Sequence, residues 1–210
     1  MDKTITVTGT AEVSAAPDLA VVSLGVESLA ATASGARTSA SENMRKLLDI
    51  LREARVESRD IQTQHIELEP EYDHTSSTGR TLRGYVARNT VSVKLRDIAR
   101  SGEIIDRVLE VAGDSARLNG ISFDFADPAA LYDRCRREAI AEAQRRAATY
   151  ADSAGVAVGE VLEISERPTD GAPRVAYRAR AMTSAAMPVE AGEESVRVDV
   201  VVRFALVAKP

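Results

Sequence analysis

Apolar and polar residues alternate along residues 4–13, where Ile5, Val7, Ala11 and Val13 are separated by threonines and a glutamate. This period of two predicts a strand with one buried face. Residues 19–26 differ, because their apolar side chains fall on both faces, which predicts a strand inside a sheet that is covered on both sides. With Pro17 and Asp18 forming a tight connection, residues 4–26 are expected to form a hairpin.

Residues 82–95 also alternate, and their two faces differ in chemistry. One face carries Tyr85, Ala87, Val91, Val93 and Leu95, and the other carries Arg88, Thr90, Ser92, Lys94 and Arg96. The polar face is expected to be solvated or to meet charged partners. A preceding strand is predicted over residues 61–68, ended by Pro70, with the polar residues 71–80 as the tip of a hairpin.

Three further strands are predicted over residues 116–125, 158–165 and 195–207. The last alternates over its whole length, from Val196 to Leu206. Its length and late position predict that it pairs with an early strand. Gly9, inside the first strand, is interpreted as a bulge or a close backbone crossing and not as part of a phosphate-binding turn.

Apolar residues at spacings of three and four predict three helices. The first lies within residues 27–55, and a shorter one covers residues 98–112 and ends at Gly113. The third begins at Asp127 and Pro128 and stops at Gly155. Its narrow stripe of mostly small residues is expected to lie close to a sheet or a neighbouring helix. The predicted stripe consists of Cys135, Ala139, Ala143, Ala147 and Tyr150.

This order of elements predicts an α+β fold, in which a mixed, largely antiparallel sheet packs with two longer helices and one short helix. Residues 1–210 are interpreted as a single domain. Residues 168–193 are rich in Pro, Gly, Ala and Arg without a clear period, and are expected to form a long mobile loop, because such loops are often functional or mobile.

Composition limits the classes of function. The chain of 210 residues has a net charge of −5, so its surface as a whole repels nucleic acid, and no nucleic-acid partner is expected. No apolar run approaches the length of a transmembrane helix. The first residues lack the features of a signal peptide. A cytoplasmic location is therefore expected for the chain as it stands, and a periplasmic or secreted one if it is a mature form.

The sequence contains no recognisable catalytic motif, so no enzyme activity and no cofactor are expected. His65 and His74 are too few for a metal centre, and Cys135, the single cysteine, is interpreted as a buried packing residue. A weak ligand or partner contact is assigned to six cationic side chains. These are Arg88, Lys94 and Arg96 on the polar strand face, and Arg174, Arg178 and Arg180 in the long loop.

Several segments in register resemble the SIMPL-domain family, which includes the bacterial periplasmic immunogenic proteins. The matching segments are residues 5–13, 17–20, 24–26, 60–63, 70–72, 84–89, 120–123, 139–155 and 188–192. The sequence departs from the family pattern by lacking the usual signal peptide, by Asp114-Ser115 after Gly113, and by a cysteine at position 135 where alanine is usual.

The resemblance implies an α+β subunit, in some members with a dodecin-like helix wrapped by a bent sheet, and in at least one type a large ring-like or channel-like oligomer. It also implies an envelope location and protection from oxidative stress, and supplies no catalytic residues. A self-assembling binding or scaffold module is the leading hypothesis. The alternatives are a small-ligand or anion-binding protein, and an adaptor that binds another protein through residues 168–193.

Overall fold

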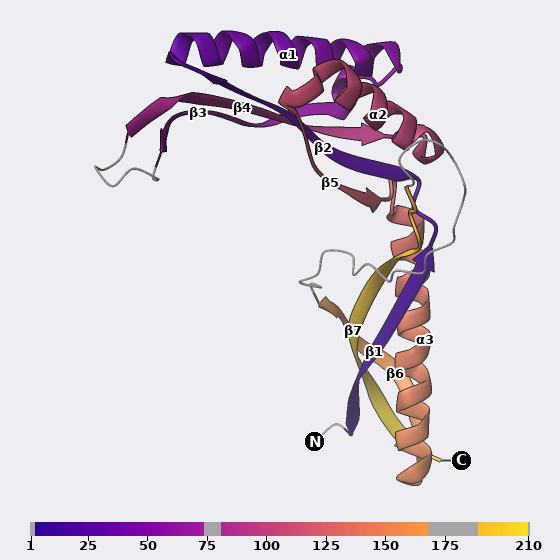
Figure 1. Ribbon diagram of the computed structural model, residues 1–210. Coiled ribbons are helices and arrows are strands. Elements are labelled where there is room, and N and C mark those ends of the chain that lie inside the picture. The colour runs from indigo at the N-terminus through magenta and orange to yellow at the C-terminus, as the bar shows by residue number, and fades with distance from the viewer. Residues whose placement is uncertain (1–2, 74–80, 168–188, 210) are drawn as a thin grey trace. The chain divides into compact units, whose positions relative to one another are not determined.

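The computed structural model describes residues 3–73, 81–167 and 189–209 and has the predicted α+β class. Its described residues form two antiparallel sheets and divide into two compact units (Figure 1). The strands are β1 (Thr4–Ala15), β2 (Leu19–Ala30), β3 (Ile61–Asp73), β4 (Thr81–Leu95), β5 (Ala116–Asp124), β6 (Val156–Arg167) and β7 (Glu194–Ala208). The helices are α1 (Ala33–Glu53), α2 (Ser101–Ala112) and α3 (Ala129–Ser153), with short 3-10 turns at Ser58–Asp60, Ile98–Arg100 and Gly113–Ser115.

One unit contains a four-stranded sheet in the order β3-β4-β2-β5. Helices α1 and α2 contribute with β2 and β4 to one hydrophobic core, so they cover one face of this sheet. The alternation predicted for β4 is confirmed, because Ala87, Val91, Val93 and Leu95 all belong to that core. In β2 the core residues are Ala20, Val22, Leu24 and Val26, whereas Val21 and Ser23 on the other face are only partly buried.

The other unit contains a three-stranded sheet in the order β1-β7-β6, with α3 packed on it. The late strand β7 pairs with the early strand β1, as predicted, from Thr4 opposite Ala205 to Ala15 opposite Glu194. Helix α3 approaches the sheet closely, since a Cβ atom on Gly9 would lie 2.0 Å from the main-chain oxygen of Ala139. Gly9 is therefore a close backbone crossing, as its position in the strand predicted.

The hairpin predicted for residues 4–26 is wrong. β1 pairs with β7, whereas β2 lies between β4 and β5 in the other sheet. Alternation reveals which face of a strand is buried but not which strand lies beside it, and a proline-containing connection allows the chain to leave a sheet as readily as to turn back. The interior position predicted for β2 is confirmed by its two neighbours, β4 and β5. The predicted cover on both sides is wrong for the described residues, because α1 and α2 pack on one face and Val21 and Ser23 on the other face are partly exposed.

Two local predictions also need correction. Pro70 does not end its strand, because β3 continues to Asp73 and Pro70 lies opposite Tyr85. An edge strand tolerates proline where the missing N–H would face away from the neighbour. In α3, the fifth small residue of the buried stripe is Ala151, while Tyr150 is 62% exposed. A spacing of four along the helix reaches Ala151 and not Tyr150.

The predicted hairpin tip at residues 74–80 lies outside the described residues, although β3 and β4 pair as antiparallel neighbours up to Asp73 and Thr81. Residues 168–188 of the predicted long loop also lie outside the described part of the chain. The predicted helix ends agree with positive backbone angles at Gly113, with φ of 55°, and at Gly155, with φ of 69°.

Candidate functional site

Charged side chains form a network on the face of the four-stranded sheet opposite helices α1 and α2. Arg88 on β4 contacts Glu27 on β2 at 2.8 Å and Glu67 on β3 at 3.1 Å, and it also pairs with Glu69. Glu27 in turn contacts Arg117 on β5 at 3.0 Å. The register explains this arrangement, because Glu27, Arg88 and Glu67 lie directly opposite one another on neighbouring strands. The network thus links all four strands.

The carboxylates of the network occupy the Arg88 side chain, so that it is not free to bind a ligand. Hydrogen bonds from Arg88 lower the pKa of Glu27 below its ordinary value, assisted by Arg117 and opposed by partial burial. The three carboxylates likewise raise the pKa of the Arg88 guanidinium. A guanidinium that already binds three carboxylates gains little from a further anion. The polar face of β4 therefore meets charged partners, as predicted, but at Arg88 these partners belong to the chain itself.

Arg96 is similarly engaged, at the other end of β4. Its Nε and Nη2 atoms donate to the two carboxylate oxygens of Asp60 at 2.9 and 2.8 Å, and the Asp60 side chain is only 6% exposed. These bonds hold the pKa of Asp60 below its ordinary value, against the effect of burial. Such a two-pronged bond fixes the turn before β3 to the end of β4.

Lys94 and Arg96 line one small cavity of about 140 Å³, together with Arg55, Arg100, Asp60 and Asp97. Arg88 is six residues from Lys94 on the same strand, a distance of about 20 Å. The structure thus brings together two of the predicted contact residues and leaves the third apart. Arg174, Arg178 and Arg180 lie outside the described residues.

The remaining residues considered as candidates for a metal or redox site are His65, His74 and Cys135. His65 is exposed on β3, 3.7 Å from Glu67, and His74 lies outside the described residues. Within the described ranges, no three His, Cys, Asp or Glu side chains are grouped so that they could hold a metal ion. Cys135 is fully buried, as predicted. Its Sγ atom lies 3.2 Å from the main-chain oxygen of Ala11, and burial raises the pKa of the thiol.

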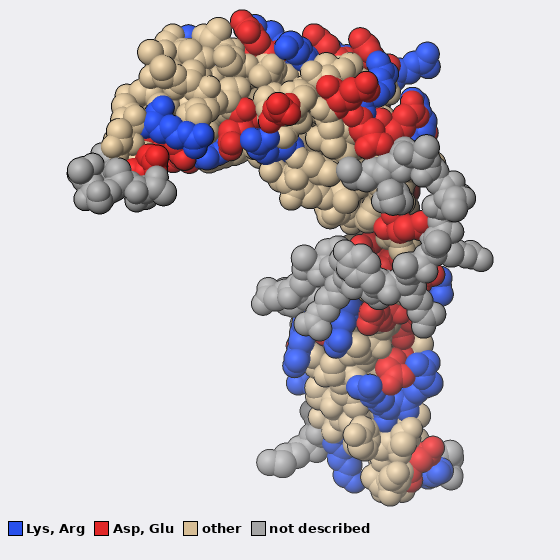
Figure 2. Space-filling view, in the orientation of Figure 1, with Lys and Arg blue, Asp and Glu red and all other residues tan. Residues whose placement is uncertain are grey.

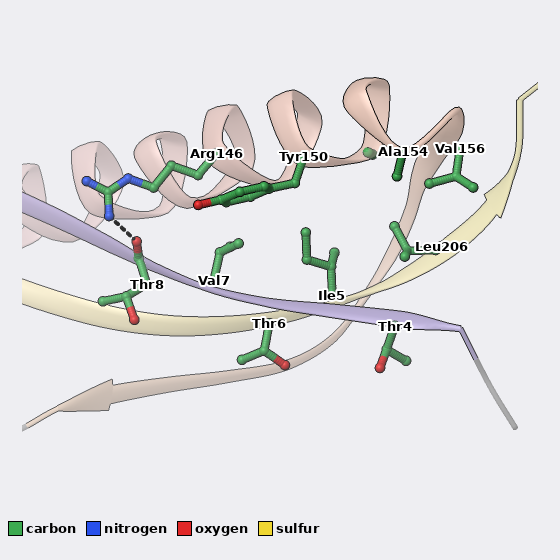
Figure 3. A pocket seen from close by; sticks show the side chains of 11 residues that line it. Thr4, Ile5, Thr6, Val7, Thr8, Arg146, Tyr150, Ala154, Val156 and Leu206 are labelled. Carbon is green, nitrogen blue, oxygen red and sulfur yellow. Dashed lines mark hydrogen bonds between the residues drawn. The ribbon is translucent and has the colours of Figure 1, made fainter.

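A larger groove lies in the three-stranded unit, at a place that the sequence did not predict. It has a volume of about 660 Å³ and is lined by Thr4 to Thr8 of β1, by Arg146, Tyr150 and Ala151 of α3, and by neighbouring residues at the end of the sheet. In Figure 3, Ile5 and Val7 point toward α3, whereas Thr4 and Thr6 point away. Tyr150 was predicted to belong to the stripe that packs closely, but it is exposed. The polar residues Thr149, Asp152 and Ser153 near it in the sequence could have indicated an open surface.

The family model for SIMPL, described as a protein of unknown function (DUF541), matches residues 5–204. This chain belongs to the SIMPL family. Two relatives from Brucella abortus (strain S19) and Brucella melitensis, each named 26 kDa periplasmic immunogenic protein, are 36% identical over 95% of this chain and 83% of their own length. The uncharacterized protein YggE of Escherichia coli (strain K12) is 29% identical over 90% of this chain and 75% of its own length.

The SIMPL match covers strands and helices of both units, so the two sheets are both part of the family pattern. The family description gives no activity, and the residues of the charge network are therefore interpreted from their geometry alone. None of the helices within the described residues is apolar and long enough to cross a membrane.

Proposed function

We propose that this SIMPL-domain protein is a non-enzymatic module that assembles with copies of itself and serves as a binding or scaffold protein. The observation that carries the proposal is the incomplete cover of the three-stranded sheet. Helix α3 contacts β1 and β7 extensively but β6 much less. Val161, Leu162 and Ile164 of β6 are consequently left exposed to solvent.

Two of the exposed apolar residues on β6 lie on the face of the sheet that carries α3. Val161 is opposite Phe204 and Ile164 is opposite Val202, and both β7 residues are buried on the face that packs against α3. Val161 and Ile164 share that face but are 45% and 52% exposed. Because β6 is also an edge strand in the described sheet, it offers both unpaired backbone groups and apolar area, a combination typical of strands that pair with another chain.

A second copy would complement this edge in charge. If two β6 strands paired antiparallel across a twofold axis at Ser165, Glu163 of one copy would lie opposite Arg167 of the other. Opposite charges at directly facing positions stabilise a strand pair, and a twofold arrangement makes this contact twice. The sequence of β6 therefore favours a second copy over an unrelated apolar partner.

The proposal includes an envelope location, which is supported by the two Brucella relatives that are named periplasmic. A protective role in oxidative stress would then depend on assembly or binding. The chain's own thiol is unsuited to redox chemistry, because Cys135 is fully buried and its pKa is raised by burial, whereas reactive thiols need exposure and a lowered pKa.

Native mass spectrometry at micromolar concentration tests the assembly. The wild-type chain is expected to form a defined oligomer, and Ile164→Glu should shift it toward monomer, because the new carboxylate would enter the apolar contact and lie opposite Glu166 of the other copy. Ile66→Glu, at a 71% exposed position on β3, is the matched control and should leave the oligomer unchanged. A monomeric wild-type chain, or equal effects of the two substitutions, would contradict the proposal.

Anion binding is the second candidate, and the cavity beside Lys94 is the observation that favours it. Its lining includes four cationic and three acidic side chains, and Arg96 is held in place by Asp60. Phosphate should raise the midpoint of thermal unfolding of the wild-type chain, and Lys94→Met should remove this shift. An equal phosphate effect in both proteins would exclude this cavity. The adaptor hypothesis concerns residues 168–193, of which residues 168–188 lie outside the described part of the chain.

A further inference from the structure

Among the described strands, β1 is an edge of its sheet, so its outer side carries backbone groups at alternate residues that no described strand pairs. The main-chain N–H of Leu206 donates to the oxygen of Lys3 at 2.8 Å, and the pairing continues in the same register through β1. In an antiparallel pair, residues alternate between those that bond to the neighbour and those whose N–H and C=O point away from it. The outward-pointing groups are therefore those of Thr4, Thr6 and Thr8, whereas Ile5 and Val7 bond to β7.

This edge borders the groove of about 660 Å³ described above, whose apolar walls are Ile5 and Val7 on β1 and Ala151 on α3. The Tyr150 ring lies between the helix and the strand (Figure 3) and is 62% exposed. The volume falls within the usual range of about 300 to 1,000 Å³ for ligand sites, and it is large enough for a few side chains. The groove therefore combines main-chain donors and acceptors with apolar area.

Arg146 marks one end of the open edge. Its Nη1 atom donates to the main-chain oxygen of Thr8 at 2.8 Å, and its Nε atom donates to Glu142 at 2.7 Å. The side chain thus occupies the acceptor that a neighbouring strand would otherwise use. Arg145 binds the same carboxylate, so two guanidinium groups share one negative charge. Figure 2 shows basic and acidic side chains side by side on the surface of the unit with the three-stranded sheet.

We infer that this groove binds an extended peptide segment of a partner protein, which adds to β1 as a fourth strand and places a carboxylate near Arg146. The backbone of the peptide would bond to Thr4 and Thr6, and its alternate apolar side chains would pack against Ile5 and Val7. Addition of a strand to an open edge is a common mode of peptide recognition. A second copy that docks through its own β1 edge suits the groove less well, because it would bring a second Arg146 to the same place.

This inference does not depend on the proposed assembly, since β1 and β6 are opposite edges of the sheet. The test is panning of a phage-displayed peptide library against the full-length chain, followed by affinity measurements with the enriched peptides. These peptides should share alternating apolar residues and an acidic residue. A substitution that removes one outward N–H distinguishes strand addition from other modes of binding.

Thr6→Pro is that substitution, because it removes an N–H that faces away from β7 and leaves the pairing between β1 and β7 intact. The affinity of enriched peptides should fall about tenfold, as expected for one lost hydrogen bond and local misfit. Thr6→Val retains the N–H and should bind as the wild type does. Arg146→Met should weaken acidic peptides about tenfold or more, with little effect on peptides whose acidic residue is replaced by glutamine.

Circular dichroism and thermal unfolding establish whether each variant is folded, and Arg146→Met provides an independent readout if Thr6→Pro is not. The inference is overturned if no peptides are enriched, or if enriched peptides bind wild type, Thr6→Pro and Arg146→Met equally. It is also overturned if Thr6→Pro converts an oligomeric wild-type chain into monomers, since a second copy would then occupy this edge. Loss of assembly in Ile164→Glu with unchanged peptide binding would leave it standing.

Discussion

Gly9 of β1 and Ala139 of α3 are so close that any side chain on Gly9 would collide with the helix backbone. A Cβ atom at this position would lie 2.0 Å from the Ala139 oxygen and 2.8 Å from the Ala143 nitrogen. Both neighbours are main-chain atoms, which cannot move aside as the end of a flexible side chain can. The approach of the helix to the sheet therefore depends on glycine at this position.

Gly9→Ala should lower the free energy of unfolding by about 3 kcal/mol, the upper part of the range for overpacked interiors. The helix must move away from the sheet and lose contacts along its stripe of alanines. Urea denaturation followed by circular dichroism measures the change. Gly159→Ala is the control, because its added Cβ would meet atoms at 3.2 Å and should cost less than about 1 kcal/mol. Equal costs would contradict this account.

Arg88→Met should destabilise the protein because it leaves Glu27, Glu67 and Glu69 together without their shared cation. The Arg88 side chain is 35% exposed, so solvent screening limits the loss to about 1 kcal/mol. The loss should be smaller in concentrated salt, which screens the remaining carboxylates. Arg83→Met, an exposed position on the same strand, should change stability little. If the Arg88→Met variant were as stable as the wild type, the network would not contribute to the stability of the fold.

The pair formed by Asp60 and Arg96 should make stability depend on pH. Arg96 lowers the pKa of Asp60 in the folded protein, so the contribution of Asp60 is complete above its unfolded pKa of about 3.9. It is lost as the pH falls through the lower folded value. Asp60→Asn should therefore cost about 1 to 2 kcal/mol near neutral pH, and the difference from wild type should shrink in acid.

Urea denaturation at a series of pH values measures this difference. Asp49→Asn serves as the control, since Asp49 pairs with Arg52 at a largely exposed site where such pairs contribute little. A difference between wild type and Asp60→Asn that stays constant from neutral to strongly acidic pH would contradict the assignment.

Cys135 should be unreactive in the folded protein. The side chain has no exposed surface and burial raises its thiol pKa, so the thiolate is both scarce and inaccessible. A thiol reagent such as Ellman's reagent should label Cys135 only in concentrated urea, and Cys135→Ala should abolish that labelling. Complete labelling of the native chain within the mixing time would show that the thiol is accessible and would restore a redox role.

The elements of the fold were predictable from the sequence because their signals are local. The alternation in β4 separated Val91 and Val93 from Arg88, and helix α3 begins and ends near its predicted Asp127 and Gly155. Which strands pair with one another was harder to predict. The pairing of β1 with β7 joins residues that lie nearly the whole chain apart. Only the length and late position of the last strand indicated that it pairs with an early one.

The candidate sites were harder to predict than the elements. The alternation of residues 82–95 places Lys94 and Arg96 on one polar face, but the carboxylate partners of Arg88 and Arg96 are set by the register of β2, β3 and β4. The groove beside β1 was missed because it depends on which backbone groups of Thr4 and Thr6 remain unpaired. No residue type reveals that property before the neighbouring strand is known.

The partnership of β1 with β7 has a consequence for synthesis on the ribosome. The four-stranded unit comprises elements from β2 to β5, which form a continuous stretch of chain, so it can fold as soon as that stretch has emerged. β1 is made before the other described elements but obtains its neighbour β7 only after β2 to β6 have been made. At a translation rate of about 5 to 20 residues per second, this exposed threonine-rich strand would wait about 10 to 40 seconds for β7. The backbone groups of β1 thus have no partner strand until β7 has been made. A chaperone that covers β1 during this time would prevent it from pairing with another chain.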